Sequence, residues 1–184
     1  ISHKMNNGIS KLSSNLEGDL LKRSEKINNR IGFLLGLNEY RSLASQFSGQ
    51  DLKNEINQSL RIFIEMLSFN ANLSGVPLIL IFEDLHWADQ GSLESLSYIV
   101  NTLNLDQRRQ KDSEHHCFFI FDYREDFSLP KMIHNMEGFS TINLEPLNAI
   151  DCHEMSKHFI EELIIPDEVV GTLLEYSKGN PFFI

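Results

Sequence analysis

Residues 77–89 constrain the fold of this chain more than any other stretch. Five apolar residues, Leu78–Phe82, follow a proline and precede two acids, Glu83 and Asp84. A short continuous apolar run of this kind is typical of a parallel strand that is buried on both faces. Because ligands of open α/β sheets bind at the carboxyl ends of the strands, we expect the two acids to lie at a ligand crevice.

The pair of acids indicates a particular chemistry. One carboxylate can hold Mg²⁺ or its water shell while the second polarises an attacking water, as phosphoryl transfer requires. The same apolar run with two acids also fits a plain strand that runs into a polar turn. The pattern alone therefore leaves both interpretations open.

Further elements are predicted around this segment. Asp89 can cap a helix whose apolar positions 93, 96, 100 and 103 repeat at helical spacing. Residues 117–121 form a second apolar run, and residues 139–144 are predicted to form a third strand. A strand, a helix and a strand in succession predict two parallel strands joined by a crossover. This arrangement brings Arg124 to the edge of the sheet where the two acids lie.

Residues 1–70 are predicted to be mostly helical. Within residues 31–47, Gly32 and Gly36 are expected to interrupt the helical pattern. Ser48 and Asp51 match a capping box, which predicts that a long helix starts there. Its apolar stripe is expected to face the sheet. The stripe consists of Leu52, Ile56, Leu60, Phe63 and Leu67.

The pattern after Pro146 is helical only, so we expect one domain over residues 1–145 and a helical one over 146–184. Asn148 is expected to cap the first helix of this second domain, and Pro166 to precede the next. Gly179 is expected to end that helix. The side chains expected to point inward are Cys152, Met155, Phe159, Val169, Val170 and Leu173.

Composition excludes several classes of protein. The 184 residues, 41% of them hydrophobic, suffice for a globular core, and a formal net charge of −10 opposes non-specific binding to nucleic acid or anionic lipid. The longest apolar runs are far short of the roughly 20 residues that span a bilayer. Cys117 and Cys152 have no paired spacing, which favours reduced thiols. We expect a soluble, cytoplasmic protein without direct nucleic-acid or membrane contacts.

Three segments together resemble one known family. Residues 83–89, Glu-Asp-Leu-His-Trp-Ala-Asp, resemble the Walker B segment of STAND-type P-loop NTPases, which are relatives of AAA+ proteins. Residues 119–125 resemble the sensor-1 strand, and residues 177–183 resemble the glycine-x-proline motif of the helical lid. The resemblance implies an α/β fold, namely a partial parallel-sheet P-loop NTPase core followed by a helical lid.

The resemblance also implies roles for individual residues. Asp84 and Glu83 would bind Mg²⁺ and act in catalysis, and Arg124 would point at the γ-phosphate. Glu83, Arg124 and Pro181 would contact the nucleotide, so the implied cofactors are ATP and Mg²⁺. Many members of the family have aspartate where this chain has Glu83, which would reach the metal shell through a longer arm.

The phosphate-binding loop of this family is absent from residues 1–184, which contain no Gly-x-x-x-x-Gly-Lys-[Ser/Thr]. We expect the chain to be a fragment that starts after the P-loop and that is inactive by itself. The parent protein would be an ATP-hydrolysing switch in bacterial signalling, linked to adenylate cyclases, kinases or transcription activators. Its partners would be ATP or ADP, effector or sensor domains of the same chain and, through nucleotide-dependent self-association, other copies.

Two alternatives remain open from the sequence. The first is an interaction scaffold with a degenerate nucleotide site that does not hydrolyse ATP. The second is an AAA+ replication initiator or helicase loader. Such a protein should carry a basic DNA-binding domain, so the net charge of −10 makes this alternative less favourable. Within the Walker B segment, we expect His86 and Trp87 to be mostly structural. The indole would cover the sheet edge with its N–H bonded, and its truncation to alanine would cost about 3–5 kcal/mol if it is buried. His86 would be a hydrogen-bonded polar neighbour.

Overall fold

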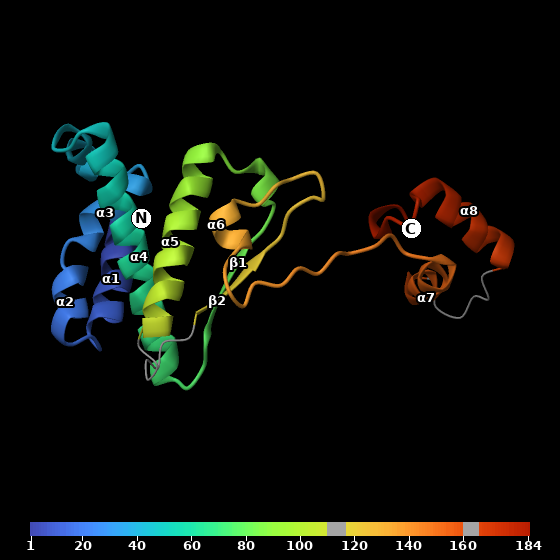
Figure 1. Ribbon diagram of the computed structural model, residues 1–184, viewed down its shortest axis with the longest axis horizontal. Helices are drawn as coiled ribbons and strands as arrows, with labels where there is room; N and C mark the ends of the chain where they lie inside the picture. The colour runs from blue at the N-terminus through green and yellow to red at the C-terminus, as the bar shows by residue number, and fades with distance from the viewer. Residues whose placement is uncertain (110–116, 160–165) are drawn as a thin grey trace. The chain divides into compact units, whose positions relative to one another are not determined.

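The computed structural model describes residues 1–109, 117–159 and 166–184, which form two compact units (Figure 1). The first unit comprises Ile1–Phe139 and the second Ser140–Ile184. The division lies a few residues before Pro146, where the helical pattern of the second unit was expected to begin. Residues 110–116, including His115 and His116, and residues 160–165 lie outside the described part of the chain.

The first half of unit 1 is a helical bundle. It contains α1 (Ser2–Ser13), α2 (Gly18–Ser24), α3 (Ile27–Leu34), the 3-10 helix η1 (Asn38–Ser45) and α4 (Gly49–Leu73). Figure 1 shows α1, α2 and α3 packed along α4. Their core is built from Ile9, Leu16, Ile27 and Met66. The predicted helical character of residues 1–70 is confirmed.

Two local predictions in this bundle have different outcomes. The Oγ of Ser48 accepts a hydrogen bond from the backbone N–H of Asp51 at 3.3 Å, so the predicted cap of α4 is confirmed. Gly32, by contrast, does not interrupt α3. A Cβ at this position would lie 2.1 Å from the ring of Tyr40, so Gly32 provides the space in which Tyr40 packs. Gly36, with a φ of +68°, follows the end of the helix.

Phe63, a member of the predicted apolar stripe of α4, does not pack against the sheet as expected. Phe63 and Met66 pack with α1 and α3, while α5 (Gln90–Arg109) covers the strands (Figure 1). Helical periodicity predicts that a face is buried, but it does not specify the neighbour that buries it. The predicted contact with the sheet was therefore wrong for Phe63, which contacts other helices instead.

Two parallel strands, β1 (Leu78–Phe82) and β2 (Cys117–Phe121), form the sheet of the described residues, with Phe82 opposite Phe121. Both strands and their parallel pairing are as predicted. Burial on both faces is not, because only the face with Phe82, Phe119 and Phe121 packs against Leu96 and Val100 of α5. The other face exposes Ile79, Ile81, Phe118 and Ile120.

The third predicted strand does not form. Residues 139–144 carry no strand, and the side chains of Ile142 and Leu144 are exposed. Alternating apolar residues favour a strand, but a strand needs a neighbour for its backbone hydrogen bonds. The short helix α6 (Lys131–His134), which was not predicted, instead places Ile133 in the core with Leu129.

Unit 2 contains α7 (Ala149–Phe159), α8 (Asp167–Ser177) and the 3-10 helix η3 (Pro181–Phe183). Asn148 caps α7 as predicted, because its Oδ1 accepts from the N–H of Ile150 at 2.9 Å and of Asp151 at 3.0 Å. Cys152 and Val170 form the small core, whereas Val169 is exposed and was wrongly expected to point inward. The side chain of Phe159 lies outside the described part of the structure.

The end of α8 depends on close backbone contact. Both Lys178, with φ +52°, and Gly179, with φ +74°, adopt left-handed conformations, so the helix ends where predicted. The N–H of Leu147 donates to the carbonyl of Gly179 at 2.8 Å. A Cβ at Gly179 would lie 2.5 Å from the Leu147 oxygen, so only glycine fits there without displacement.

Candidate functional site

The carboxyl ends of β1 and β2 are joined by backbone hydrogen bonds. The N–H of Asp122 donates to the carbonyl of Phe82, and the N–H of Leu85 donates to the carbonyl of Asp122, both at 2.9 Å. These bonds hold the residues after each strand at the same edge. Glu83 and Asp84 after β1, and Arg124 after β2, are all exposed there.

The chain turns sharply after the two acids. Asp84 has a left-handed backbone with φ +54°, which aspartate adopts more readily than most other residues. The 3-10 helix η2 (Leu85–Trp87) follows directly, with Leu85 buried in the core. Leu85 therefore anchors the turn while the Asp84 carboxylate stays in solvent.

Trp87 and Arg124 meet at this edge. The Arg124 guanidinium carbon lies 5.9 Å from the centroid of the indole ring, a cation–π distance. Trp87 is 76% exposed, so the condition of a buried indole is not met. Sequence analysis also missed the pairing of these two residues. The available signal was that both follow the ends of strands predicted to be parallel neighbours.

The imidazole of His86 is largely buried next to the exposed Trp87 ring. Its side chain is only 11% exposed, and its Nε2 is 3.7 Å from Oδ1 of Asp84, too long for a hydrogen bond. Neither ring nitrogen has a hydrogen-bond partner among the described residues. The expected hydrogen-bonded imidazole is therefore not found, and the ring instead lies 5.3 Å from the ring of Trp87.

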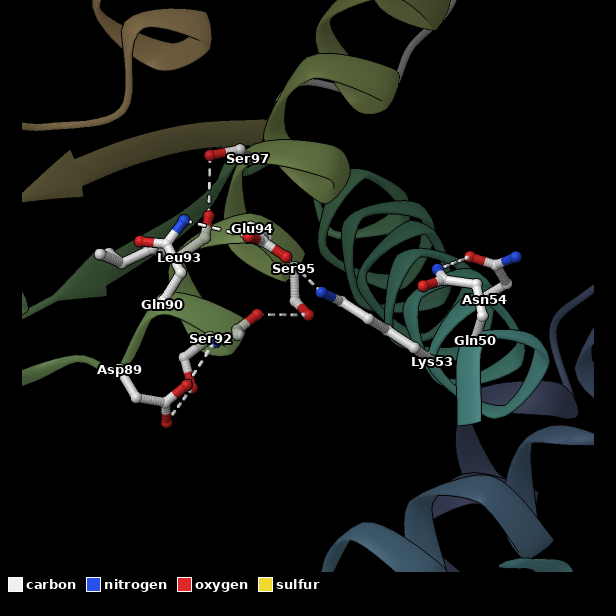
Figure 2. Close-up of polar contacts among 11 residues, drawn as sticks. Gln50, Lys53, Asn54, Asp89, Gln90, Ser92, Leu93, Glu94, Ser95 and Ser97 are labelled. Carbon is white, nitrogen blue, oxygen red and sulfur yellow. Dashed lines mark hydrogen bonds and ion pairs between the residues drawn. The ribbon is translucent and has the colours of Figure 1, made fainter. Parts of the chain in front are cut away.

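Asp89 connects the turn to α5 (Figure 2). Its Oδ1 accepts from the N–H of Ser92 at 2.9 Å, and its Oδ2 accepts from the Ser92 hydroxyl at 3.1 Å. These hydrogen bonds hold the pKa of the Asp89 carboxyl below its ordinary value. The predicted cap of α5 is confirmed, so Asp89 has a structural role.

A second set of polar contacts links α5 to the helical bundle. Figure 2 shows Lys53 of α4 reaching Glu94 of α5, with which it forms an ion pair. Gln90 also donates to Glu94 at 3.0 Å. The hydrogen bond from Lys53 is the main cause that lowers the pKa of Glu94. The helix after the acidic turn is thus held at its start by its own cap and by α4.

The donor set at the turn suits a hard cation. Carboxylate oxygens are the ligands that Mg²⁺ prefers, and Mg²⁺ is commonly held by one or two carboxylates with waters and substrate phosphates. In the described ranges, no three side chains of His, Cys, Asp or Glu gather as a metal site. Two carboxylates do not complete the coordination of Mg²⁺. Glu83 and Asp84 would therefore hold the ion together with further ligands, such as waters or substrate phosphates.

Pro181 belongs to unit 2. It begins η3 directly after Asn180, whose Oδ1 accepts from the N–H of Phe182 at 3.0 Å. Its local structure is that of a proline at the first position of a capped helical turn. Glu83, Asp84 and Arg124 belong to unit 1, so the expected contact of Pro181 with a nucleotide stays a prediction.

Comparison with protein-family models, curated proteins and solved structures found no match to this chain. None of the helices in the described ranges is both long and apolar enough to span a membrane.

Proposed function

We propose that unit 1 contributes two metal-binding acids and a phosphate-facing arginine to the nucleotide site of a regulatory ATPase. The observation that carries the proposal is the joining of the ends of β1 and β2, which gathers Glu83, Asp84 and Arg124 at one edge. Carboxylates that bind Mg²⁺ and a cation that faces a phosphate are the parts that phosphoryl transfer requires. The resemblance of residues 83–89 to the Walker B segment of STAND-type NTPases supports it.

In this proposal each residue has a distinct role. Glu83 and Asp84 would hold the shell of Mg²⁺, and Asp84 would also orient and polarise the attacking water. Arg124 would stabilise charge on the γ-phosphate, and a nucleotide contact of Pro181 is implied by the family resemblance alone. When bound, Mg²⁺ would neutralise charge on the phosphates. The protein would act in the cytoplasm as a switch for effector domains, with ATP and ADP as its ligands.

The proposal requires a phosphate-binding loop, which residues 1–184 do not contain. In P-loop NTPases, backbone N–H groups and a lysine of that loop hold the β- and γ-phosphates. The residues at the ends of β1 and β2 are therefore suited to bind a metal ion and to orient a water molecule. They are not sufficient to bind a triphosphate by themselves.

An interaction scaffold without hydrolysis is the second candidate, and one observation favours it. Trp87 is exposed with Arg124 over its ring, and tryptophan and arginine are the residues most enriched at the energetic centres of protein interfaces. A replication initiator or helicase loader is less well supported because the chain is acidic.

The ATPase proposal is tested by Asp84→Asn in the full-length protein. Loss of a group that orients water should lower ATP turnover by on the order of 10²–10⁴ while ATP binding remains. Asp126→Asn is the matched control, because Asp126 is also an exposed acid beyond the end of β2. Full turnover in Asp84→Asn would exclude the proposed role, and absence of turnover in the unmodified protein would favour the scaffold.

A further inference from the structure

An apolar groove of about 870 Å³ runs along α1 in the helical bundle, bordered by α3 and α4. The helices that line it lie on the far side of α5 from the strands (Figure 1). A volume of this size is within the range of known small-molecule ligand sites. Its apolar side chains are those of Ile1, Met5, Ile9, Leu12, Ile31, Leu35 and Phe63.

The charge of the groove is opposite to that of the whole chain. Lys4 and Lys11 line it and are exposed, and none of the described residues that line it is acidic. The first acid in the sequence is Glu17, although the chain has a formal net charge of −10. This local excess of positive charge favours an anionic occupant.

The spacing of the two lysines restricts the shape of that occupant. Residues seven apart lie on the same side of a helix and about 10.5 Å apart along its axis. Two carboxylates at a similar separation give each ammonium group a partner of its own, whereas a single carboxylate, such as the head of a fatty acid, would have to be shared between the two. An α-helix with acids seven residues apart presents two carboxylates at the matching distance.

Space for such a helix exists at Gly8. This residue lies between Lys4 and Lys11 on α1, it lines the groove, and a Cβ there would have no atom within 4 Å. Apolar side chains of an approaching helix can therefore lie over Gly8 and contact Met5 and Leu12, which are also seven residues apart. This is the arrangement of an amphipathic helix bound in a groove.

We propose that this groove binds an acidic amphipathic helix of a partner protein. Its apolar residues would fill the groove over Gly8, and two of its acids, one heptad apart, would pair with Lys4 and Lys11. The proposal does not depend on nucleotide chemistry, because none of the residues at the ends of β1 and β2 takes part.

The probe is a labelled synthetic peptide of about 18 residues, long enough to be helical when bound, with leucine at its core positions and glutamate beside them. A second peptide has lysine in place of each glutamate. Fluorescence anisotropy with the chain of residues 1–184 should show binding of the acidic peptide and at least about ten-fold weaker binding of the basic one. Equal binding of both would overturn the proposal.

A blocking variant tests the location. A Cβ at Gly8 meets no atom within 4 Å, so Gly8→Trp can place an indole at the groove; it should weaken binding of the acidic peptide by about ten-fold or more, because the central contact area is lost. Gly171→Trp is the matched control, since Gly171 is an exposed glycine within α8 that also has no neighbouring atom within 4 Å of a Cβ. Equal affinities for the two variants would place the binding elsewhere and overturn the proposal.

A charge-reversal pair tests the recognition. Lys4→Glu with Lys11→Glu should abolish the preference for the acidic peptide. The control, Lys22→Glu with Lys26→Glu, makes the same change in net charge at exposed lysines outside the groove and should preserve it. The same loss in both pairs would overturn specific recognition.

A dimer of the unmodified chain that Gly8→Trp dissociates, seen by sedimentation, would assign the groove to a second copy and also overturn the proposal.

Discussion

Trp87 lies on the surface beside Arg124, so its side chain contributes little buried area to the fold. We predict that Trp87→Ala lowers the free energy of unfolding by less than about 1 kcal/mol, the scale of an exposed cation–π contact. Ile133→Ala is the comparison, because Ile133 is fully buried in the core and its truncation should cost about 2–5 kcal/mol. Urea unfolding followed by circular dichroism measures both. A similar loss in the two variants would contradict the exposed position of the indole.

At the scale of the element, the start of α5 depends on the Asp89 carboxylate. Hydrogen bonds from Ser92 hold the Asp89 pKa below its ordinary value of 3.8. A lowered pKa in the folded state stabilises the protein above the unfolded-state pKa, and this contribution is lost as the pH falls through the folded-state value. Asp89→Asn should therefore be less stable than the unmodified protein at neutral pH, and the difference should shrink as the pH falls below 3.8 and the Asp89 carboxylate becomes protonated.

The fluorescence of Trp87, the single tryptophan, can follow urea unfolding of this region across that pH range. Asp126→Asn serves as the control, because Asp126 is exposed and does not begin a helix. A constant difference between Asp89→Asn and the unmodified protein at every pH would show that the charge of Asp89 does not contribute to the cap.

At the scale of the whole molecule, the residues gathered at the sheet edge can position a metal and water but lack a loop that holds phosphates. We predict that residues 1–184 bind Mg·ATP more weakly than micromolar, because backbone N–H groups and a P-loop lysine supply most of the phosphate binding. Calorimetric titration with Mg·ATP measures this, with Mg²⁺ alone as the control. Micromolar affinity would show that residues 1–184 bind the phosphates without a P-loop, and it would contradict the proposed nucleotide site.

The sequence by itself determined the features whose physical cause lies within a few residues. The caps at Ser48, Asp89 and Asn148 are made by side chains that bond to backbone N–H groups two or three residues ahead, so their spacing alone predicts them. The bounds of β1 and β2 follow from two continuous apolar runs, and their parallel pairing follows from the helix between them. These elements in turn place Glu83, Asp84 and Arg124 at one edge.

Only the tertiary structure decided the features that depend on distant partners. Residues 139–144 have the composition of a strand, but without a neighbouring strand among the described residues they stay unpaired. Three features depend on which surfaces meet: the exposed outer face of β1 and β2, the contact of α4 with the other helices, and the position of Arg124 over the Trp87 ring. Periodicity tells which side chains are apolar, whereas burial depends on the neighbour that covers them.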